Sequence, residues 1–172
     1  NHDIGQNGIS EENKILAVNE FSKIARVFIS SESILPDELA KYKFPLKPEH
    51  MHSAIFYSSL VYGESGSMTA EASYLGTPSI FLNNLGLGYT DSLEHNFGLV
   101  YNYNESKEDQ IKSIRKGVEI LKTNDDKVFS DRRKALLDSS IDVNKFMYWF
   151  VTEFPASHST MKKDPNSQYN FK

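Results

Sequence analysis

Short apolar segments alternate with helix-forming segments along most of this 172-residue chain. Four of the apolar segments are predicted to be strands, because they are brief, rich in β-branched and aromatic residues, and bounded by turn-forming residues: 26–30, 60–63, 79–82 and 99–103. The segments between them are too long for hairpins, so the strands are expected to be parallel. The pattern predicts an α/β fold, a doubly wound parallel sheet with helices on both faces.

Helices are predicted from cap residues and from apolar side chains at helical spacing. Ser10 and Ser106 are typical N-cap residues, and Gly76 followed by Pro78 is a typical helix end. The predicted helices are 10–24, 36–42, 48–59, 68–75, 91–95, 106–121, 125–137 and 142–153. Residues 1–154 are expected to form one Rossmann-like domain. The polar, aperiodic segment 155–172 is expected to be a loosely ordered tail or to lie across the surface.

Composition excludes several classes of function. Nineteen Lys and Arg against 23 Asp and Glu give a net charge of -4. The chain therefore lacks the positive field that attracts nucleic acids. The absence of cysteine excludes disulfides, thiolate zinc sites and cysteine nucleophiles, and makes the cytoplasm the default location. No apolar run is long enough to span a membrane, and the polar N-terminus is no signal peptide. The chain begins without methionine, so it is expected to be a piece of a longer protein.

The segment 63–67 follows a predicted strand and begins a helix. In open α/β sheets, ligands bind beyond the carboxyl ends of the strands, where a helix start offers unpaired N–H groups. Gly66 would let a phosphate approach the backbone, and Ser65 and Ser67 could add hydroxyl donors, so the segment could hold a diphosphate. Ser and Gly before a helix are also ordinary capping residues, so both interpretations stay open.

Glu71 lies about one turn further into the same predicted helix. It does not complete a capping box, because methionine occupies position 68, where the box requires Glu or Gln. A carboxylate at this place could accept hydrogen bonds from ribose hydroxyls. The alternative is that Glu71 is simply a solvated helix residue.

The segment Gly63–Pro78 resembles the Ser-Gly…Glu-Ala…Leu-Gly-Thr-Pro signature of the donor-binding, C-terminal half of GT-B-fold proteins. It is most similar to a bacterial and archaeal family of glycosyltransferase-like proteins related to the non-hydrolysing UDP-N-acetylglucosamine 2-epimerases, over about residues 1–122. The resemblance implies that Ser65, Gly66 and Ser67 bind the diphosphate of a nucleotide sugar and that Glu71 binds its ribose. It also implies a missing N-terminal domain and no cofactor other than the nucleotide sugar, with UDP as the expected nucleotide.

Histidines supply a few weaker candidates for the cleft. His2, followed by Gly5 and Gly8, resembles the His-Arg-Arg-Glu segment that opens the second domain of those epimerases, although Asp3 and Ile4 stand where that segment has arginines. His2 is therefore a candidate catalytic residue. His50 and His52 would project to different sides of a helix, so packing or capping roles are expected and no metal site is predicted.

Polar residues at the ends of other predicted strands would line the same edge of the sheet. Glu32 follows the first strand, and Asn83 and Asn84 follow the third, so these side chains could contact the base or the sugar. Ordinary loop polarity explains them equally well. The aromatic run 146–150 is expected to form a helix that is buried or packs on a partner domain, and that could mediate a homodimer.

Two functional hypotheses follow. The first is a nucleotide-sugar-binding half of a GT-B glycosyltransferase or sugar-nucleotide epimerase, inactive when isolated because catalysis needs the other half of the cleft. The second is a non-catalytic α/β interaction module that has kept the fold, lost the site and binds a partner through the aromatic helix.

Overall fold

The computed structural model describes residues 8–31, 34–45, 47–123 and 125–172. The contacts divide the chain after Arg133 into two compact units. The sequence predicts a boundary after residue 154, so the division lies earlier than expected, within helix α7 (Asp126–Ser139). Each unit is described by itself.

The first unit contains a parallel sheet of three strands, in the order β1 (Val61–Gly63), β2 (Ser79–Leu82) and β3 (Val100–Tyr103). Ile80 of the central strand pairs with Tyr62 on one side and Tyr101 on the other. All four residues of β2 are buried, as expected for a strand covered on both faces. Three of the predicted strands and the α/β class are confirmed.

The predicted strand 26–30 does not join this sheet. Ile29 forms only an isolated bridge with Lys43. Its N–H donates to Tyr42 O at 2.7 Å, and its carbonyl accepts from Phe44 N at 2.8 Å. Phe28 is 46% exposed. The prediction of a buried strand is wrong because the nearby segment 42–44 satisfies the backbone of Ile29 instead.

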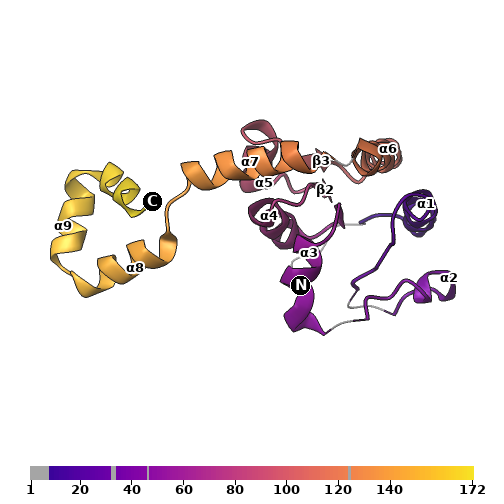
Figure 1. Ribbon diagram of the computed structural model, residues 1–172, viewed down its shortest axis with the longest axis horizontal. Helices are drawn as coiled ribbons and strands as arrows, with labels where there is room; N and C mark the ends of the chain where they lie inside the picture. The colour runs from indigo at the N-terminus through magenta and orange to yellow at the C-terminus, as the bar shows by residue number, and fades with distance from the viewer. Residues whose placement is uncertain (1–7, 32–33, 46, 124) are drawn as a thin grey trace. The chain divides into compact units, whose positions relative to one another are not determined.

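The helices of the first unit follow the predicted alternation. They are α1 (Glu11–Phe21), α2 (Asp37–Ala40), the 3-10 turn η1 (Pro48–His50), α3 (Met51–Phe56), α4 (Gly66–Leu75), α5 (Gly88–His95), α6 (Lys107–Thr123) and the start of α7. Helices α4 and α6 lie on opposite sides of the sheet, and α1 packs against α6 (Figure 1). Ser10 caps α1, and Gly76 ends α4 at φ 90°, as predicted.

A core cluster lies between α1, α6 and β1. Ala17, Phe21 and Ile114 are buried at its centre, and the Tyr62 ring meets Phe21 edge-on with ring centroids 5.2 Å apart. The Tyr62 hydroxyl lies 2.9 Å from Ser113 Oγ. Ser113 donates its own proton to the carbonyl of Gln110, so Tyr62 is the donor in this pair.

Because of Tyr62, the free energy of unfolding is expected to fall by about 2–3 kcal/mol as the pH rises from 10 to 12 and above. Burial raises the pKa of Tyr62 from 10.0 to about 12, so the folded protein keeps the proton that the unfolded chain releases. The stabilisation is complete below pH 10 and is lost as the pH rises through the folded-state pKa. Urea unfolding at a series of alkaline pH values measures this slope, and Tyr62→Phe should remove most of it. An equal slope in both proteins would contradict the assignment.

The second unit contains the end of α7, then α8 (Val143–Thr152), α9 (Ala156–Lys163) and the 3-10 helix η2 (Pro165–Phe171). Of the two alternatives expected for the segment 155–172, the loosely ordered tail is wrong, and the segment lies against α8 instead. Phe171 lies 5.6 and 5.0 Å from the ring centroids of Phe146 and Trp149, and buried Ser157 donates to Phe150 O. These contacts cover part of the aromatic run of α8 and hold the tail in a helical hairpin.

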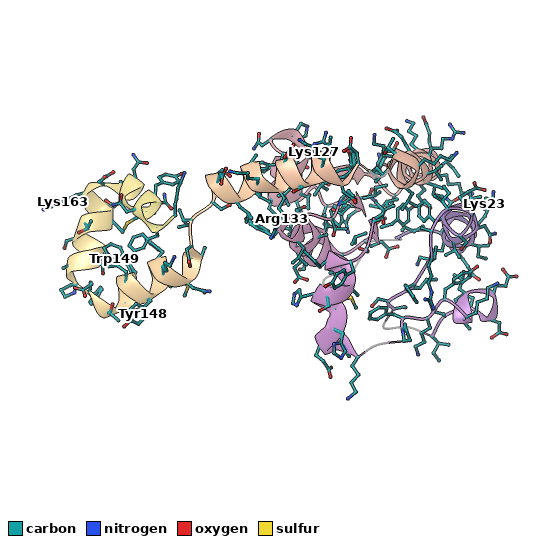
Figure 2. The ribbon with its side chains drawn as sticks, in the orientation of Figure 1. Lys23, Lys127, Arg133, Tyr148, Trp149 and Lys163 are labelled. Atoms are coloured by element: carbon teal, nitrogen blue, oxygen red, sulfur yellow. The ribbon has the colours of Figure 1, made fainter. Side chains whose placement is uncertain are left out.

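The other side of α8 is exposed. Asp142 caps the predicted helix by accepting from Lys145 N at 3.0 Å, while Met147, Tyr148 and Val151 are 58%, 75% and 71% exposed. Figure 2 shows Tyr148 on the outside of this hairpin and Trp149 inside it. Among the described residues, none of the helices has the length and apolar character that crossing a bilayer requires.

Candidate functional site

The carboxyl ends of the three strands lie at one edge of the sheet, because the strands are parallel. β1 runs into Gly63–Gly66 and α4, β2 into the loop 83–87 before α5, and β3 into the loop 104–106 before α6. The residues predicted to bind phosphate, ribose, base or sugar lie at this edge or in α4, with the exception of Glu32. Glu32 and His2 lie outside the described residues.

The first turn of α4 combines a cap with exposed hydroxyl groups. Ser65 Oγ accepts from Met68 N at 3.3 Å, so Ser65 is the N-cap and the capping interpretation applies to it. Gly66 and Ser67 follow in the first turn, where an amide has no acceptor within the helix. The exposed hydroxyl of Ser67 adds a further donor at the positive end of α4.

Gly66 is closely approached by residues of the loop before α5 and of α5 itself. A Cβ atom built on Gly66 would lie 2.3 Å from the Tyr89 hydroxyl and 2.6 Å from Leu87 Cδ1. Tyr89 is nevertheless 47% exposed. Tyr89 and Leu87 therefore occupy the space over Gly66 that was expected to be open to a phosphate, and their packing by itself requires a glycine there. The Tyr89 phenol beside the helix start was not identified from the sequence.

Glu71 faces helix α3. Its Oε2 lies 3.3 Å from His52 Nε2, and both side chains remain substantially exposed to solvent. Glu71 is thus neither a capping residue nor simply solvated, while His52 is placed against α4.

The two asparagines after β2 organise the loop. Asn83 Oδ1 accepts from Leu85 N at 2.8 Å, which closes a turn. Asn84 exchanges two hydrogen bonds with Glu105, one from its own Nδ2 at 2.9 Å and one from Glu105 N at 3.0 Å. The side chains of Asn83 and Asn84 therefore stabilise the loop, and Asn84 also links the loop after β2 to the loop after β3.

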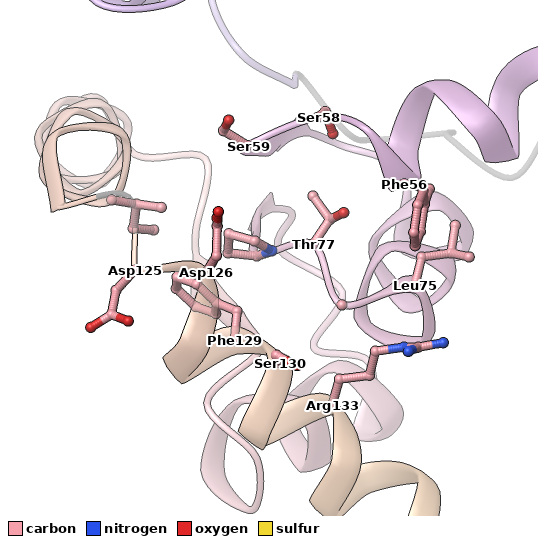
Figure 3. A pocket seen from close by; sticks show the side chains of 13 residues that line it. Phe56, Ser58, Ser59, Leu75, Thr77, Asp125, Asp126, Phe129, Ser130 and Arg133 are labelled. Atoms are coloured by element: carbon pink, nitrogen blue, oxygen red, sulfur yellow. The ribbon is translucent and has the colours of Figure 1, made fainter.

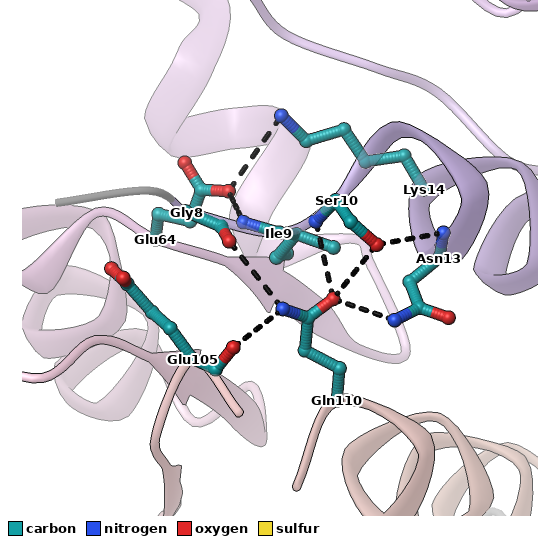
Figure 4. A network of polar contacts seen from close by, with 8 residues as sticks. All are labelled: Gly8, Ile9, Ser10, Asn13, Lys14, Glu64, Glu105 and Gln110. Atoms are coloured by element: carbon teal, nitrogen blue, oxygen red, sulfur yellow. Dashed lines mark hydrogen bonds and ion pairs between the residues drawn. The ribbon is translucent and has the colours of Figure 1, made fainter. Parts of the chain in front are cut away.

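A polar network beside the turn after β1 was not predicted (Figure 4). Gln110 is buried; its Oε1 accepts from Ser10 N at 3.1 Å and Asn13 Nδ2 at 2.7 Å, and its Nε2 donates to Glu105 O at 2.8 Å. Glu64 accepts from Ile9 N and lies 3.7 Å from Lys14 Nζ. The network fixes the segment 8–10 alongside the candidate helix start.

The only sequence signal for this network was weak. Gln110 is the fourth residue after the Ser106 cap, where a polar residue is unremarkable, and its partners Ser10 and Asn13 are about 100 positions away in the chain. Glu64 likewise stood in the candidate segment without an assigned role. Both were identifiable only once the fold had brought the segment 8–14 next to the turn after β1 and the start of α6.

Comparison with known proteins identifies no relative of this chain. No family model, curated protein or solved structure matches the chain. The relation to GT-B proteins thus stays a resemblance of residues, and the geometry of the sheet edge is the structural feature that bears on function.

Proposed function

We propose that this chain is the nucleotide-sugar-binding half of a GT-B-type glycosyltransferase or sugar-nucleotide epimerase, built on a doubly wound sheet. The observation that carries the proposal is the start of α4, which stands at the carboxyl edge of a parallel sheet with Gly66 and Ser67 in its first turn. Helix starts at this place favour phosphate through their amides and dipole. The expected ligand is a UDP-sugar.

In the proposed complex, the diphosphate accepts hydrogen bonds from the amides of Gly66 and Ser67. The Tyr89 hydroxyl, which stands over Gly66, turns its proton toward the phosphate oxygens or moves aside. Glu71 exchanges its contact with His52 for the ribose hydroxyls. During glycosyl transfer, the same amides would stabilise charge on the leaving diphosphate, and the second domain would supply the acceptor or the base.

Glu71→Ala is expected to weaken UDP binding by about 1–2 kcal/mol, because two hydrogen bonds to a charged acceptor are lost at an exposed site. Binding of inorganic diphosphate, which has no ribose, should be nearly unchanged. Amide chemical shifts of the full chain measure both titrations, and the shifts are expected at Gly66 and Ser67. Glu49→Ala, which removes an exposed glutamate from η1, is the matched control.

An equal loss of UDP and diphosphate binding would contradict the ribose role of Glu71. Shifts confined to other parts of the chain would contradict the helix-start site itself. No shift with UDP or UDP-N-acetylglucosamine at millimolar concentration would favour the second candidate function.

That second candidate is a non-catalytic interaction module. It is favoured by three exposed apolar side chains of α8, those of Met147, Tyr148 and Val151, which α9 and η2 leave uncovered. Exposed apolar patches on a helix commonly mark a protein contact. Sedimentation of the full chain tests the simplest form of this candidate, a homodimer, which Val151→Glu should dissociate.

A further inference from the structure

A hollow of about 340 Å³ lies at the opposite edge of the sheet, where the strands begin (Figure 3). Its walls come from the connection before β1, the connection before β2 and the first two turns of α7. A cavity of this size suits a small molecule. It is separate from the carboxyl edge, so it plays no part in the proposed nucleotide site.

Two of the hydroxyl groups that line the hollow already donate hydrogen bonds within the protein. Ser58 Oγ and Thr77 Oγ1 both donate to the carbonyl of Ile55, each at 2.8 Å. A hydroxyl has one proton and two lone pairs, so these two groups can offer a ligand only acceptors. Thr77 is only 2% exposed, so Ser58 is the group of this pair that a ligand can reach, while Ser59 and Ser130 also line the hollow and can donate or accept.

Asp126 provides a negative charge at the same place. Within the described residues its carboxylate makes no ion pair or hydrogen bond, and in Figure 3 it points toward Ser59. Asp125 is different, because its carboxylate points away from the hollow and accepts from Val128 N at 3.1 Å. Asp126 is an exposed residue at the start of α7, so its carboxylate can attract a cation at the mouth of the hollow.

The positive charge that also borders the hollow is directed elsewhere. Arg133 Nε donates to Tyr74 O at 2.7 Å, and its guanidinium reaches past Leu75, away from Asp126 (Figure 3). A Cβ atom on Gly76 would lie 2.7 Å from Arg133 Cδ, so the stem of this arginine is packed against the glycine. Arg133 thus does not neutralise Asp126.

Apolar side chains line part of the remaining wall, beside the hydroxyl groups of Ser59 and Ser130. Phe56, Pro78, Ile120 and Phe129 line the hollow, and Phe129 is buried while Phe56 is half exposed. These surfaces would cover a hydrocarbon or aromatic body, and the ring faces favour a nearby cation.

We infer that this hollow binds a small organic cation, a primary amine or guanidinium carried on an apolar or aromatic body. Asp126 is the counter-ion, Ser58 accepts an N–H donor, and Phe56 and Phe129 cover the body. The geometry assigns the site independently of the proposed nucleotide function, because the two sites lie at opposite ends of the strands.

Three probes of similar size and different charge test the inference on the full chain: phenethylamine, 2-phenylethanol and 3-phenylpropionate. The amine is expected to bind at least about fivefold more tightly than the alcohol, and the carboxylate more weakly than both. Amide shifts should report binding at Thr77, Phe129 and Ser130. Added salt should weaken the amine alone, because only its binding includes a charge pair.

Asp126→Asn should weaken amine binding about fivefold and leave binding of the alcohol unchanged. Asp131→Asn is the matched control, since Asp131 lies on the same helix but pairs with Lys127 at 2.9 Å and does not line the hollow. Amide spectra of both variants establish that they fold. Equal binding of amine and alcohol, equal effects of the two substitutions, or shifts that map outside the hollow would each overturn the inference.

Discussion

Gly117→Val is expected to destabilise the protein by about 2–3 kcal/mol, although valine is a better helix former than glycine. Gly117 is buried in α6, and a Cβ atom there would lie 2.7 Å from two ring carbons of Phe21 and 3.2 Å from Leu60 Cδ2. The Phe21 ring cannot easily turn aside, because the Tyr62 ring packs edge-on against it. Overpacking therefore outweighs the gain in helix propensity.

Urea unfolding of the full chain measures this loss, and two further variants identify its cause. Gly88→Ala is the matched control, since Gly88 begins α5 and a Cβ atom there would meet nothing within 4 Å. That change should be neutral or slightly stabilising. Phe21→Leu destabilises by itself, yet combined with Gly117→Val it should cost less than the sum of the two changes. Additive losses would show that the Phe21 ring is not the obstacle.

The parallel sheet was predictable because its strands are defined by local pattern. The segment 79–82 has three consecutive apolar residues after Ser79 and is bounded by Pro78 and the asparagines that follow, and it is β2 with the predicted bounds. Likewise Ser10, Gly76 and Asp142 cap or end helices where local rules place them. In these places local propensity and tertiary packing favour the same structure.

The errors arose where residues outside a segment decide its structure. The segment 26–30 has the pattern of a strand, but the backbone of Ile29 is bonded by residues 42–44. The tail after residue 155 has no regular apolar spacing, yet Phe171 and Ser157 contact α8 and hold it there. A few contacts with neighbouring segments overrode the local pattern in both cases.

The candidate site divides in the same way. Ser65, Gly66 and Ser67 were predicted from the strand–turn–helix pattern, and the structure places them at the carboxyl edge of the sheet. Tyr89 and Gln110 were missed, because nothing in the sequence indicates that α5 approaches Gly66 or that α6 reaches the segment 8–10. Glu71 was singled out correctly as lacking a cap role, but its contact with His52 depends on how α3 and α4 pack.

Gln110→Ala is expected to cost about 2–4 kcal/mol, because the buried carboxamide satisfies several otherwise unpaired groups. Its removal leaves Ser10 N and Asn13 Nδ2 without their acceptor, and Glu105 O without its donor. A methyl group fills little of the vacated space, so a cavity penalty adds to the lost hydrogen bonds. Glu108→Ala, an exposed change on the same helix, is the control and should lie within about 0.5 kcal/mol of the parent protein.

The effect of Gln110→Ala should also be local in a way that a general loss of stability is not. Hydrogen exchange at Ile9 and Ser10 should accelerate more than exchange at Ile80 in the central strand, because Gln110 ties the segment 8–10 to the sheet edge. Gln110→Glu keeps an acceptor for Ser10 N but loses the donor to Glu105 O and adds a negative charge near Glu64, so it should fall between the parent and the alanine variant at neutral pH. Uniform acceleration at all three amides would mean that Gln110 supports the whole unit, and that the segment beside the helix start of α4 is held by Glu64 instead.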